Sequence, residues 1–156
     1  MVKYVFLDID GPLNTGRNDY LNPEKYGHHF DDEAVQNLRM VLIKTGADIV
    51  ISSSWRHLGH EKLNQLWKEW GLPGRIVGCT PGFWGDDQYF NTRGEEIEQW
   101  LKDNAQGPFS YVVMDDMGIE EATDRQRMLW ITIDPHCGIT KEDASKAIQL
   151  LNNNTP

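Results

Sequence analysis

The segment that decides the fold is Val2–Asp10, with the sequence VKYVFLDID. Its first six residues are largely apolar, β-branched or aromatic and have the length of a β-strand, and the run ends at Asp8 and Asp10. In open α/β sheets, ligands bind just beyond the carboxyl ends of the strands. We therefore predict a strand over Val2–Leu7, with functional residues directly after it.

Four further short apolar segments alternate with segments of helical periodicity. The predicted strands are Asp48–Ile51, Arg75–Val77, Tyr111–Met114 and Leu129–Ile133. The predicted helices are Asp32–Lys44, Glu61–Trp70, Gly94–Lys102 and Lys141–Leu151, with a weaker helix starting near Ile119 and N-caps at Asp31 or Asp32 and at Thr140. This alternation predicts a Rossmann-like three-layer α/β sandwich, in which helices cover both faces of a mainly parallel sheet of about five strands. We expect residues 1–156 to form a single domain.

The chain is acidic, with 24 Asp and Glu residues against 15 Lys and Arg and a formal net charge of −9. This balance disfavours a protein that mainly grips a nucleic-acid backbone, but it permits a small phosphate ester because a bound divalent metal supplies local positive charge. The two cysteines, Cys79 and Cys137, form no CxxC pair, and no segment has the pattern of a signal peptide or a membrane span. These features predict a cytoplasmic protein that does not associate with membranes.

Two pairs of carboxylates follow predicted strands. Asp8 and Asp10 come after the first strand, and Asp115 and Asp116 come after the fourth. Gly11 directly follows Asp10 and lets the chain turn sharply and approach a ligand closely. Because like charges repel, carboxylates that meet at one edge of a sheet are expected to hold a cation, and hard oxygen ligands suit Mg²⁺. Either pair alone could be an ordinary polar turn, whereas the two pairs together predict a magnesium site.

Hydroxyl and guanidinium groups near the same edge are candidate phosphate ligands. Ser52 and Ser53 follow the second strand, where they can either donate to phosphate oxygens or cap the next helix. Arg56 and Arg93 can each bind phosphate or form an ordinary ion pair. In a doubly wound sheet the first strand is central, so the groups after the first, second and fourth strands are expected to converge, with Arg93 entering from the side.

This set of motifs resembles the haloacid dehalogenase (HAD) superfamily of phosphohydrolases. The matching segments are VFLDIDG, the Ser after IVI, Arg93 (Lys is commoner) and VVMDD. A small HAD group, whose relatives include domains fused to RNA-repair enzymes, is more specifically similar. Its motifs resemble four segments of this chain, which are, in order, DIDGPLN, SSSWR, RGEEIEQWL and MDD. The resemblance extends over most of the chain, from Val2 to Asp134.

The resemblance implies a Mg²⁺-dependent phosphatase. Asp8 would attack phosphorus to form an aspartyl-phosphate, and Asp10 would protonate the leaving oxygen and then activate water. Mg²⁺ would be held by Asp8, the backbone carbonyl of Asp10 and Asp116, with Asp115 close behind. A second Asp at position 10 implies phosphatase chemistry rather than dehalogenation.

The resemblance also assigns the phosphate ligands to Gly11, one of the two serines, and Arg93. The end of the strand favours Ser52, whereas the spacing to the Trp of SSSWR favours Ser53. Two positions depart from the family pattern. Pro12 stiffens the turn after Gly11, and Arg93 keeps the charge of the usual Lys with a different geometry.

The loops beyond the strand ends predict an open site. Residues 14–33 form a cap-like loop that is too short for a folded cap domain, residues 78–92 form a second substrate-side loop, and residues 152–156 are a polar tail. The aromatic residues of the second loop are expected either to stack on a base or sugar or to pack the loop down; they are Phe83, Trp84, Tyr89 and Phe90. The residues expected to line the entrance are Arg17, Tyr20, His28 and His29.

The leading interpretation is therefore a magnesium-dependent phosphomonoesterase whose partner is a phosphorylated substrate. That substrate is a small metabolite, a nucleotide or a polynucleotide end; the RNA-repair resemblance favours nucleic acid, and the net charge disfavours it. The alternative is a HAD-fold protein that binds magnesium or a partner without catalysis, but the presence of all the required carboxylates argues against it. The sequence carries no signature of an oligomeric state.

Overall fold

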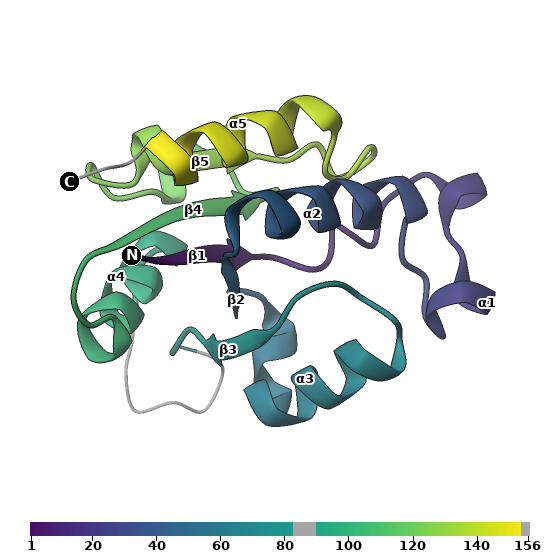
Figure 1. Ribbon diagram of the computed structural model, residues 1–156, viewed down its shortest axis with the longest axis horizontal. Helices are drawn as coiled ribbons and strands as arrows, with labels where there is room; N and C mark the ends of the chain where they lie inside the picture. Colours follow the sequence, from purple (N-terminus) through teal and green to yellow (C-terminus); the bar gives the residue numbers. More distant parts are fainter. Residues whose placement is uncertain (83–89, 154–156) are drawn as a thin grey trace.

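Five parallel strands form one sheet in the order β3-β2-β1-β4-β5 within residues 1–82 and 90–153, which are the residues that the computed structural model describes (Figure 1). The strands are β1 Val2–Leu7, β2 Asp48–Ile51, β3 Ile76–Cys79, β4 Phe109–Asp115 and β5 Trp130–Thr132. All five predicted strands are present, and the first two have the predicted bounds. The central position of the first strand, between the second and the fourth, is also confirmed.

The residues of β1 contribute alternately to two hydrophobic cores, one on each face of the sheet. Val5 and Leu7 belong to the larger core, whereas Tyr4 and Phe6 belong to the smaller one. Successive side chains of a strand point to opposite faces, so a strand with consecutive apolar residues, as β1 has over Tyr4–Leu7, is suited to burial on both sides. This explains why VKYVFL occupies the centre of the sheet.

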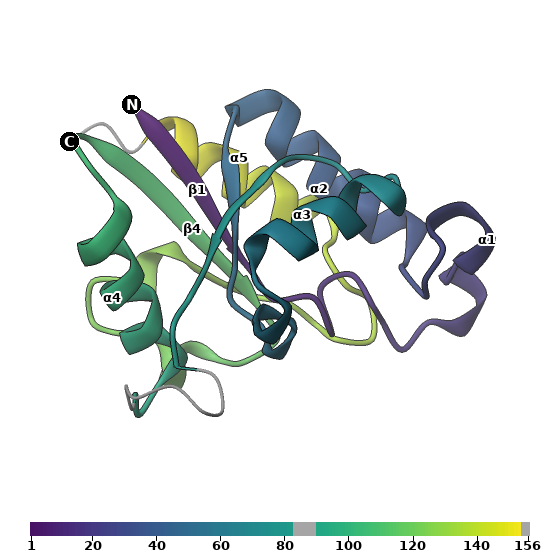
Figure 2. The same ribbon diagram turned by 90° about the horizontal axis from the view of Figure 1, so that it is seen from below.

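The helices complete a three-layer sandwich. Helices α2 (Asp32–Thr45), α3 (His60–Glu69) and α5 (Lys141–Asn153) supply side chains to the larger core, and α4 (Arg93–Asn104) packs on the opposite face through the smaller core. Figure 2 shows α4 on one side of β1 and β4, and the other three helices on the other side. The fold is thus the predicted Rossmann-like α/β sandwich.

Side-chain caps set the starts of the long helices. The Asp31 carboxylate accepts a hydrogen bond from the Ala34 N–H (3.1 Å), so Asp31 rather than Asp32 is the N-cap of α2. Thr140 and Asp143 exchange two hydrogen bonds at the start of α5, which confirms the cap predicted there. The helix predicted near Ile119 is wrong, because this segment makes only a three-residue 3-10 turn, Ile119–Glu121, and then becomes extended at Ala122.

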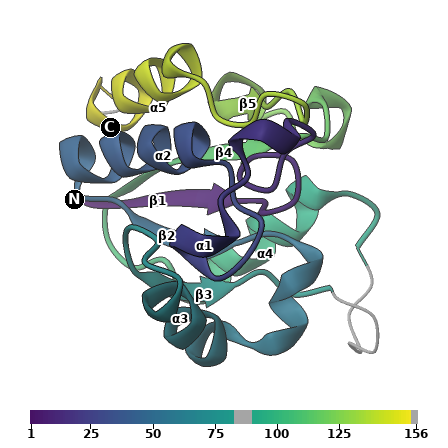
Figure 3. The same ribbon diagram turned by 90° about the vertical axis from the view of Figure 1, so that its right-hand side faces the viewer.

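Short elements occupy several connections between the strands and long helices. The 3-10 turn Asn18–Tyr20 and the four-residue helix α1 (Pro23–Tyr26) follow β1, the 3-10 turn Ser54–Leu58 follows β2, and the 3-10 turn Arg127–Leu129 leads directly into β5. The segment 14–33 closes on itself through an antiparallel bridge between Leu21 and Asp31. Figure 3 shows α1 and its flanking segments beside the end of β1. Among the described helices, none has the length and apolarity needed to cross a membrane.

Candidate active site

Three carboxylates meet where β1 and β4 end. Leu7 pairs with Met114 in the parallel ladder, and the Asp8 N–H donates to the Met114 carbonyl (3.1 Å). Asp8 and Asp115, the next residue of each chain segment, therefore lie side by side at the ends of the two adjacent strands. Oxygen atoms of Asp8, Asp115 and Asp116 lie within 4.8 Å of one another. The parallel register thus brings together acidic residues that are more than a hundred positions apart in the sequence.

Asp8 is buried, and its environment disfavours a negative charge. Burial, together with the neighbouring Asp116 and Asp115 and against the opposing effect of the Arg93 guanidinium, raises the pKa of Asp8 to about 9. One carboxylate oxygen accepts a hydrogen bond from the Ile9 N–H (2.9 Å). A cation beside Asp8 would reverse this shift, because it would stabilise the ionised form.

Asp115 is fully buried and has one unsatisfied oxygen. Burial raises the pKa of Asp115 to about 6, while Arg93 and a hydrogen bond from the Met117 N–H (2.9 Å) lower it. The other carboxylate oxygen, Oδ2, has no hydrogen-bond partner among the described residues and lies 3.4 Å from Nη1 of Arg93. A buried, incompletely satisfied carboxylate at this position has capacity left for a metal ion.

Gly11 allows the Asp116 carboxylate to lie against the backbone after β1. Its φ of 106° is in the region that favours glycine, and a Cβ atom there would lie 2.9 Å from Cγ of Asp116. The Gly11 N–H donates to the Asn14 carbonyl (2.9 Å), and the Pro12 carbonyl accepts from the Ile139 N–H (3.0 Å). Gly11 therefore shapes the site mainly by closing a tight turn, which Pro12 fixes to the segment before α5.

Asp10 lies at the exposed side of the site, and its side chain is outside the three-carboxylate cluster. Its Oδ1 accepts a hydrogen bond from the Asn14 side-chain amide (3.1 Å), and its Oδ2 accepts one from the indole N–H of Trp55 (3.0 Å). No sequence pattern indicates the Trp55 contact, because it joins segments 45 residues apart and depends on how the two side chains are oriented.

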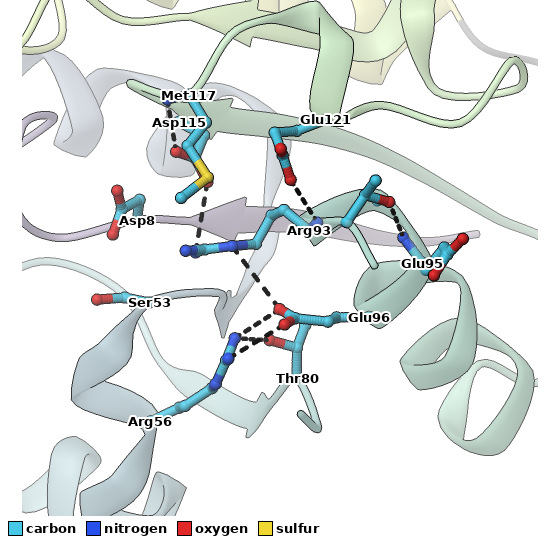
Figure 4. A network of polar contacts seen from close by, with 12 residues as sticks. Asp8, Ser53, Arg56, Thr80, Arg93, Glu95, Glu96, Asp115, Met117 and Glu121 are labelled. Carbon is cyan, nitrogen blue, oxygen red and sulfur yellow. Dashed lines mark hydrogen bonds and ion pairs between the residues drawn. The ribbon is translucent and has the colours of Figure 1, made fainter. Parts of the chain in front are cut away.

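The two serines after β2 have different surroundings. Ser52 is fully buried, and its hydroxyl has no hydrogen-bond partner among the described residues. Ser53 caps the turn Ser54–Leu58 by accepting a hydrogen bond from the Trp55 N–H (3.3 Å). Figure 4 shows the Ser53 side chain pointing to the region where Asp8 and the guanidinium of Arg93 also lie. Both serines are thus at the predicted edge, and Ser53 faces the carboxylates.

Arg93 enters the site from the first turn of α4. Thr92 caps this helix by accepting from the Glu95 N–H (3.2 Å), and the Glu121 carboxylate accepts from the Arg93 N–H (2.9 Å). These contacts fix the helix start, from which the Arg93 side chain reaches Asp115 (Figure 4). Gly94 is required beside it, because a Cβ atom there would lie 2.6 Å from the Glu121 carbonyl oxygen and 2.8 Å from the Thr123 backbone nitrogen.

Arg56, the other candidate cation, is held away from the carboxylates by Glu96. It donates to both carboxylate oxygens of Glu96 (2.6 and 3.2 Å) and to the Thr80 hydroxyl (3.3 Å). Glu96 also lies 3.7 Å from Nε of Arg93, so it bridges the two guanidinium groups (Figure 4). The i, i+3 spacing of Arg93 and Glu96 is a sequence signal for that pair. The link to Arg56 has no such signal.

The residues predicted at the entrance are mostly engaged with one another. Arg17 forms an ion pair with the buried Asp31 (2.9 Å), and its guanidinium lies 4.2 Å above the Tyr20 ring. His28 packs against Trp55, with ring centroids 5.1 Å apart, and His29 is exposed. Phe83, Trp84 and Tyr89 lie outside the described residues.

A cavity of about 880 Å³ lies beside α4 and β4, away from the carboxylate cluster. Phe90, Leu101, Phe109 and Tyr111 contribute to its walls, and none of the three clustered carboxylates does. Phe90 therefore faces this cavity rather than the three carboxylates.

Together, these contacts create a site suited to a divalent cation and a phosphate. Asp8, Asp115 and Asp116 provide only oxygen donors, which hard cations such as Mg²⁺ prefer. Arg93 is the guanidinium paired with this cluster, and Glu96 takes up part of its charge. The surplus of negative charge, the raised pKa values of Asp8 and Asp115, and the unsatisfied Oδ2 of Asp115 all fit a bound metal.

Comparison with protein families gives one match, over residues 4–144, to the family described as the HAD domain in Swiss Army Knife RNA repair proteins. Comparison with curated proteins finds no significant match, and neither does comparison with solved structures. The family match covers both carboxylate pairs, the two serines and Arg93.

Proposed function

The chain belongs to the HAD domains found in Swiss Army Knife RNA repair proteins, and on this basis we propose that it is a Mg²⁺-dependent phosphatase that hydrolyses a phosphomonoester through an aspartyl-phosphate on Asp8. The observation that carries this proposal is the convergence of Asp8, Asp115 and Asp116 at the ends of two neighbouring strands. Membership of the HAD family indicates a phosphohydrolase in general, and this cluster supports the more specific reaction.

In the proposed site, Asp8, Asp115 and Asp116 would hold Mg²⁺, and the family resemblance adds the backbone carbonyl of Asp10. The metal, when bound, would neutralise the clustered carboxylates and withdraw charge from the phosphoryl oxygens. Arg93, whose guanidinium lies 3.4 Å from Asp115, and the hydroxyl of Ser53 would bind the remaining phosphate oxygens. Ser52 is the alternative hydroxyl.

The proposed reaction has two phosphoryl-transfer steps. A carboxylate oxygen of Asp8 attacks phosphorus, the bond from phosphorus to the ester oxygen breaks, and the Asp10 carboxyl gives its proton to the departing oxygen. Water then attacks the phosphorus of the aspartyl-phosphate, its proton passes to the Asp10 carboxylate, and the bond from phosphorus to the Asp8 oxygen breaks. Phosphate leaves, and both carboxyl groups return to their starting states.

The substrate class that we favour is a nucleotide or a nucleic-acid end bearing a terminal phosphate. The RNA-repair family supports it, and the loop 14–33 is a short segment closed by the bridge between Leu21 and Asp31. The net charge of −9 argues against extended contacts with a nucleic-acid backbone, so recognition should concentrate on the terminal nucleotide. Release of phosphate from 3′- and 5′-phosphorylated oligonucleotides, mononucleotides and sugar phosphates would rank these substrates.

Hydrolysis of 4-nitrophenyl phosphate with Mg²⁺ tests the reaction itself. We expect Asp8→Asn to lower kcat/KM by about 10³-fold or more, because the variant lacks the nucleophile. Asp124→Asn is the matched control, since the Asp124 side chain is fully exposed and its ion pair is with Arg127. Full activity of Asp8→Asn would contradict the nucleophile assignment. Magnesium binding without hydrolysis of any phosphate ester would instead favour a non-catalytic binding protein.

A further inference from the structure

The carboxylate of Asp10 is held by two N–H donors that come from different parts of the chain. Asn14 donates to Oδ1 (3.1 Å) from the turn that follows β1, and the indole of Trp55 donates to Oδ2 (3.0 Å) from the turn that follows β2. Asp10 itself is exposed, so without these contacts its side chain would sample several rotamers. Two hydrogen bonds, one to each oxygen, fix both the position and the plane of the carboxyl group.

The hydrogen bonds leave each Asp10 oxygen able to take part in proton transfer. A carboxylate oxygen has two lone pairs, and each oxygen of Asp10 uses one of them for its N–H donor. Neither donor can accept a proton in return, because an amide NH₂ and an indole N–H act only as donors. The pair can therefore orient Asp10 without competing for the proton that it carries.

The Trp55 indole is itself fixed by aromatic neighbours. Its ring centroid lies 5.1 Å from that of His28, 5.8 Å from that of Trp70 and 6.4 Å from that of Phe30. His28 and Phe30 belong to the segment 14–33, and Trp70 follows α3. The orientation of the indole N–H is thus set by packing between two segments outside the carboxylate cluster.

We infer that Trp55 and Asn14 are positioning residues that hold the Asp10 carboxyl in line with the leaving oxygen of the substrate. This inference rests on the proposed function, in which Asp10 gives a proton to that oxygen as its bond to phosphorus breaks. Misalignment of a proton donor matters most when the leaving group is a poor one, because a good leaving group departs without protonation.

The test compares Trp55→Phe with wild type on aryl phosphates of graded leaving-group basicity, from 2,4-dinitrophenyl phosphate to phenyl phosphate. The quantity measured is kcat/KM, which reports the steps up to release of the leaving group. We expect a loss of about tenfold with phenyl phosphate and less than about threefold with 2,4-dinitrophenyl phosphate, giving a steeper dependence on the leaving group. Phenylalanine keeps the aromatic packing and removes only the N–H donor and part of the ring.

Trp67→Phe is the matched control, because it removes an indole N–H that donates to the Pro73 carbonyl (2.6 Å) and not to Asp10. It should leave the leaving-group dependence unchanged. Asn14→Ala removes the other donor, and it should steepen the dependence as Trp55→Phe does. It also provides the test if Trp55→Phe does not fold, as judged by its thermal unfolding midpoint.

Three outcomes separate the possibilities. An equal loss of kcat/KM with every aryl phosphate would assign Trp55 a structural role only, and an unchanged dependence in both variants would overturn the inference while the proposed function stands. Wild-type protein that hydrolyses none of these esters with Mg²⁺ would overturn the proposed function, and the inference with it.

Discussion

Glu96 is the residue on which the two candidate phosphate-binding arginines depend. Both of its carboxylate oxygens accept hydrogen bonds from Arg56, and it lies 3.7 Å from Arg93. All three side chains are nearly buried, so each charge lacks the water that would otherwise stabilise it. Glu96 thereby keeps Arg56 away from the carboxylate cluster and leaves Arg93 in contact with Asp115.

Replacing Glu96 with Gln should destabilise the protein by about 2 kcal/mol, because two buried guanidinium groups lose a compensating charge while the hydrogen-bonding shape is kept. Urea denaturation measures this change. Asp48→Asn is the comparison, since it breaks an ion pair with the exposed Arg75 and should cost less than about 1 kcal/mol. Equal losses in the two variants would show that burial of the Glu96 pair adds nothing.

At the level of residues, the sequence predicted the groups whose placement follows from topology. Asp8 and Asp115 could be placed together because both end parallel strands, and their chemistry is evident from the residue type. Glu96 and Trp55 could not be found in this way, because their contacts depend on how α4 and the turn after β2 are rotated. The choice between Arg56 and Arg93 likewise needed the structure.

Helix α2 begins at a buried carboxylate that also fixes the loop before it. Asp31 caps α2 through the Ala34 N–H, accepts from the Thr15 hydroxyl (2.8 Å) and pairs with Arg17. Asp31 therefore connects the start of α2 to Thr15 and Arg17 near the beginning of the segment 14–33. These contacts hold the two ends of this short segment together.

Asp31→Ala should destabilise the protein by about 3 kcal/mol, because it removes a helix cap and leaves Arg17 without its buried partner. Thr140→Ala, which removes only the cap of α5, should cost about 1 kcal/mol. Chemical denaturation of the two variants gives both values. A loss in Asp31→Ala no greater than that in Thr140→Ala would mean that the contacts with Thr15 and Arg17 contribute nothing.

At the level of elements, hydrophobic periodicity predicted every strand and the four long helices, because each of them carries apolar residues that are buried in one of the two hydrophobic cores. It failed for the short elements. The segment after Ile119 has few apolar positions and is held by contacts such as the bond from Gln126 to the Gly94 carbonyl (2.8 Å), so tertiary structure rather than local preference decides its conformation.

Across the whole molecule, the acidic cluster links stability to pH. Asp8 and Asp115 have raised pKa values in the folded protein, so without metal they retain protons that the unfolded chain has already released. The folded state then binds more protons than the unfolded state, and stability must decrease as the pH rises from the ordinary carboxyl range toward the raised value for Asp8.

The metal-free protein should therefore lose roughly 2–4 kcal/mol of stability between about pH 5 and pH 8, and Mg²⁺ should restore more of it at the higher pH. Thermal unfolding with EDTA or Mg²⁺ at each pH measures both effects. Asp8→Asn mimics the protonated carboxyl group and should weaken the pH dependence. A pH dependence that is the same in Asp8→Asn and wild type would show that Asp8 is not its source.

The place of β1 at the centre of the sheet has a consequence for how the protein is made. Asp8 is translated before β4, but its strand must pair with β4, and the ladder joins Val2 to Phe109. Such a distant pairing cannot form until β4 has been synthesised. The proposed nucleophile thus meets its acidic partners only after the roughly hundred residues between β1 and β4 have been added, so the nascent chain cannot complete the carboxylate cluster before β4 has emerged.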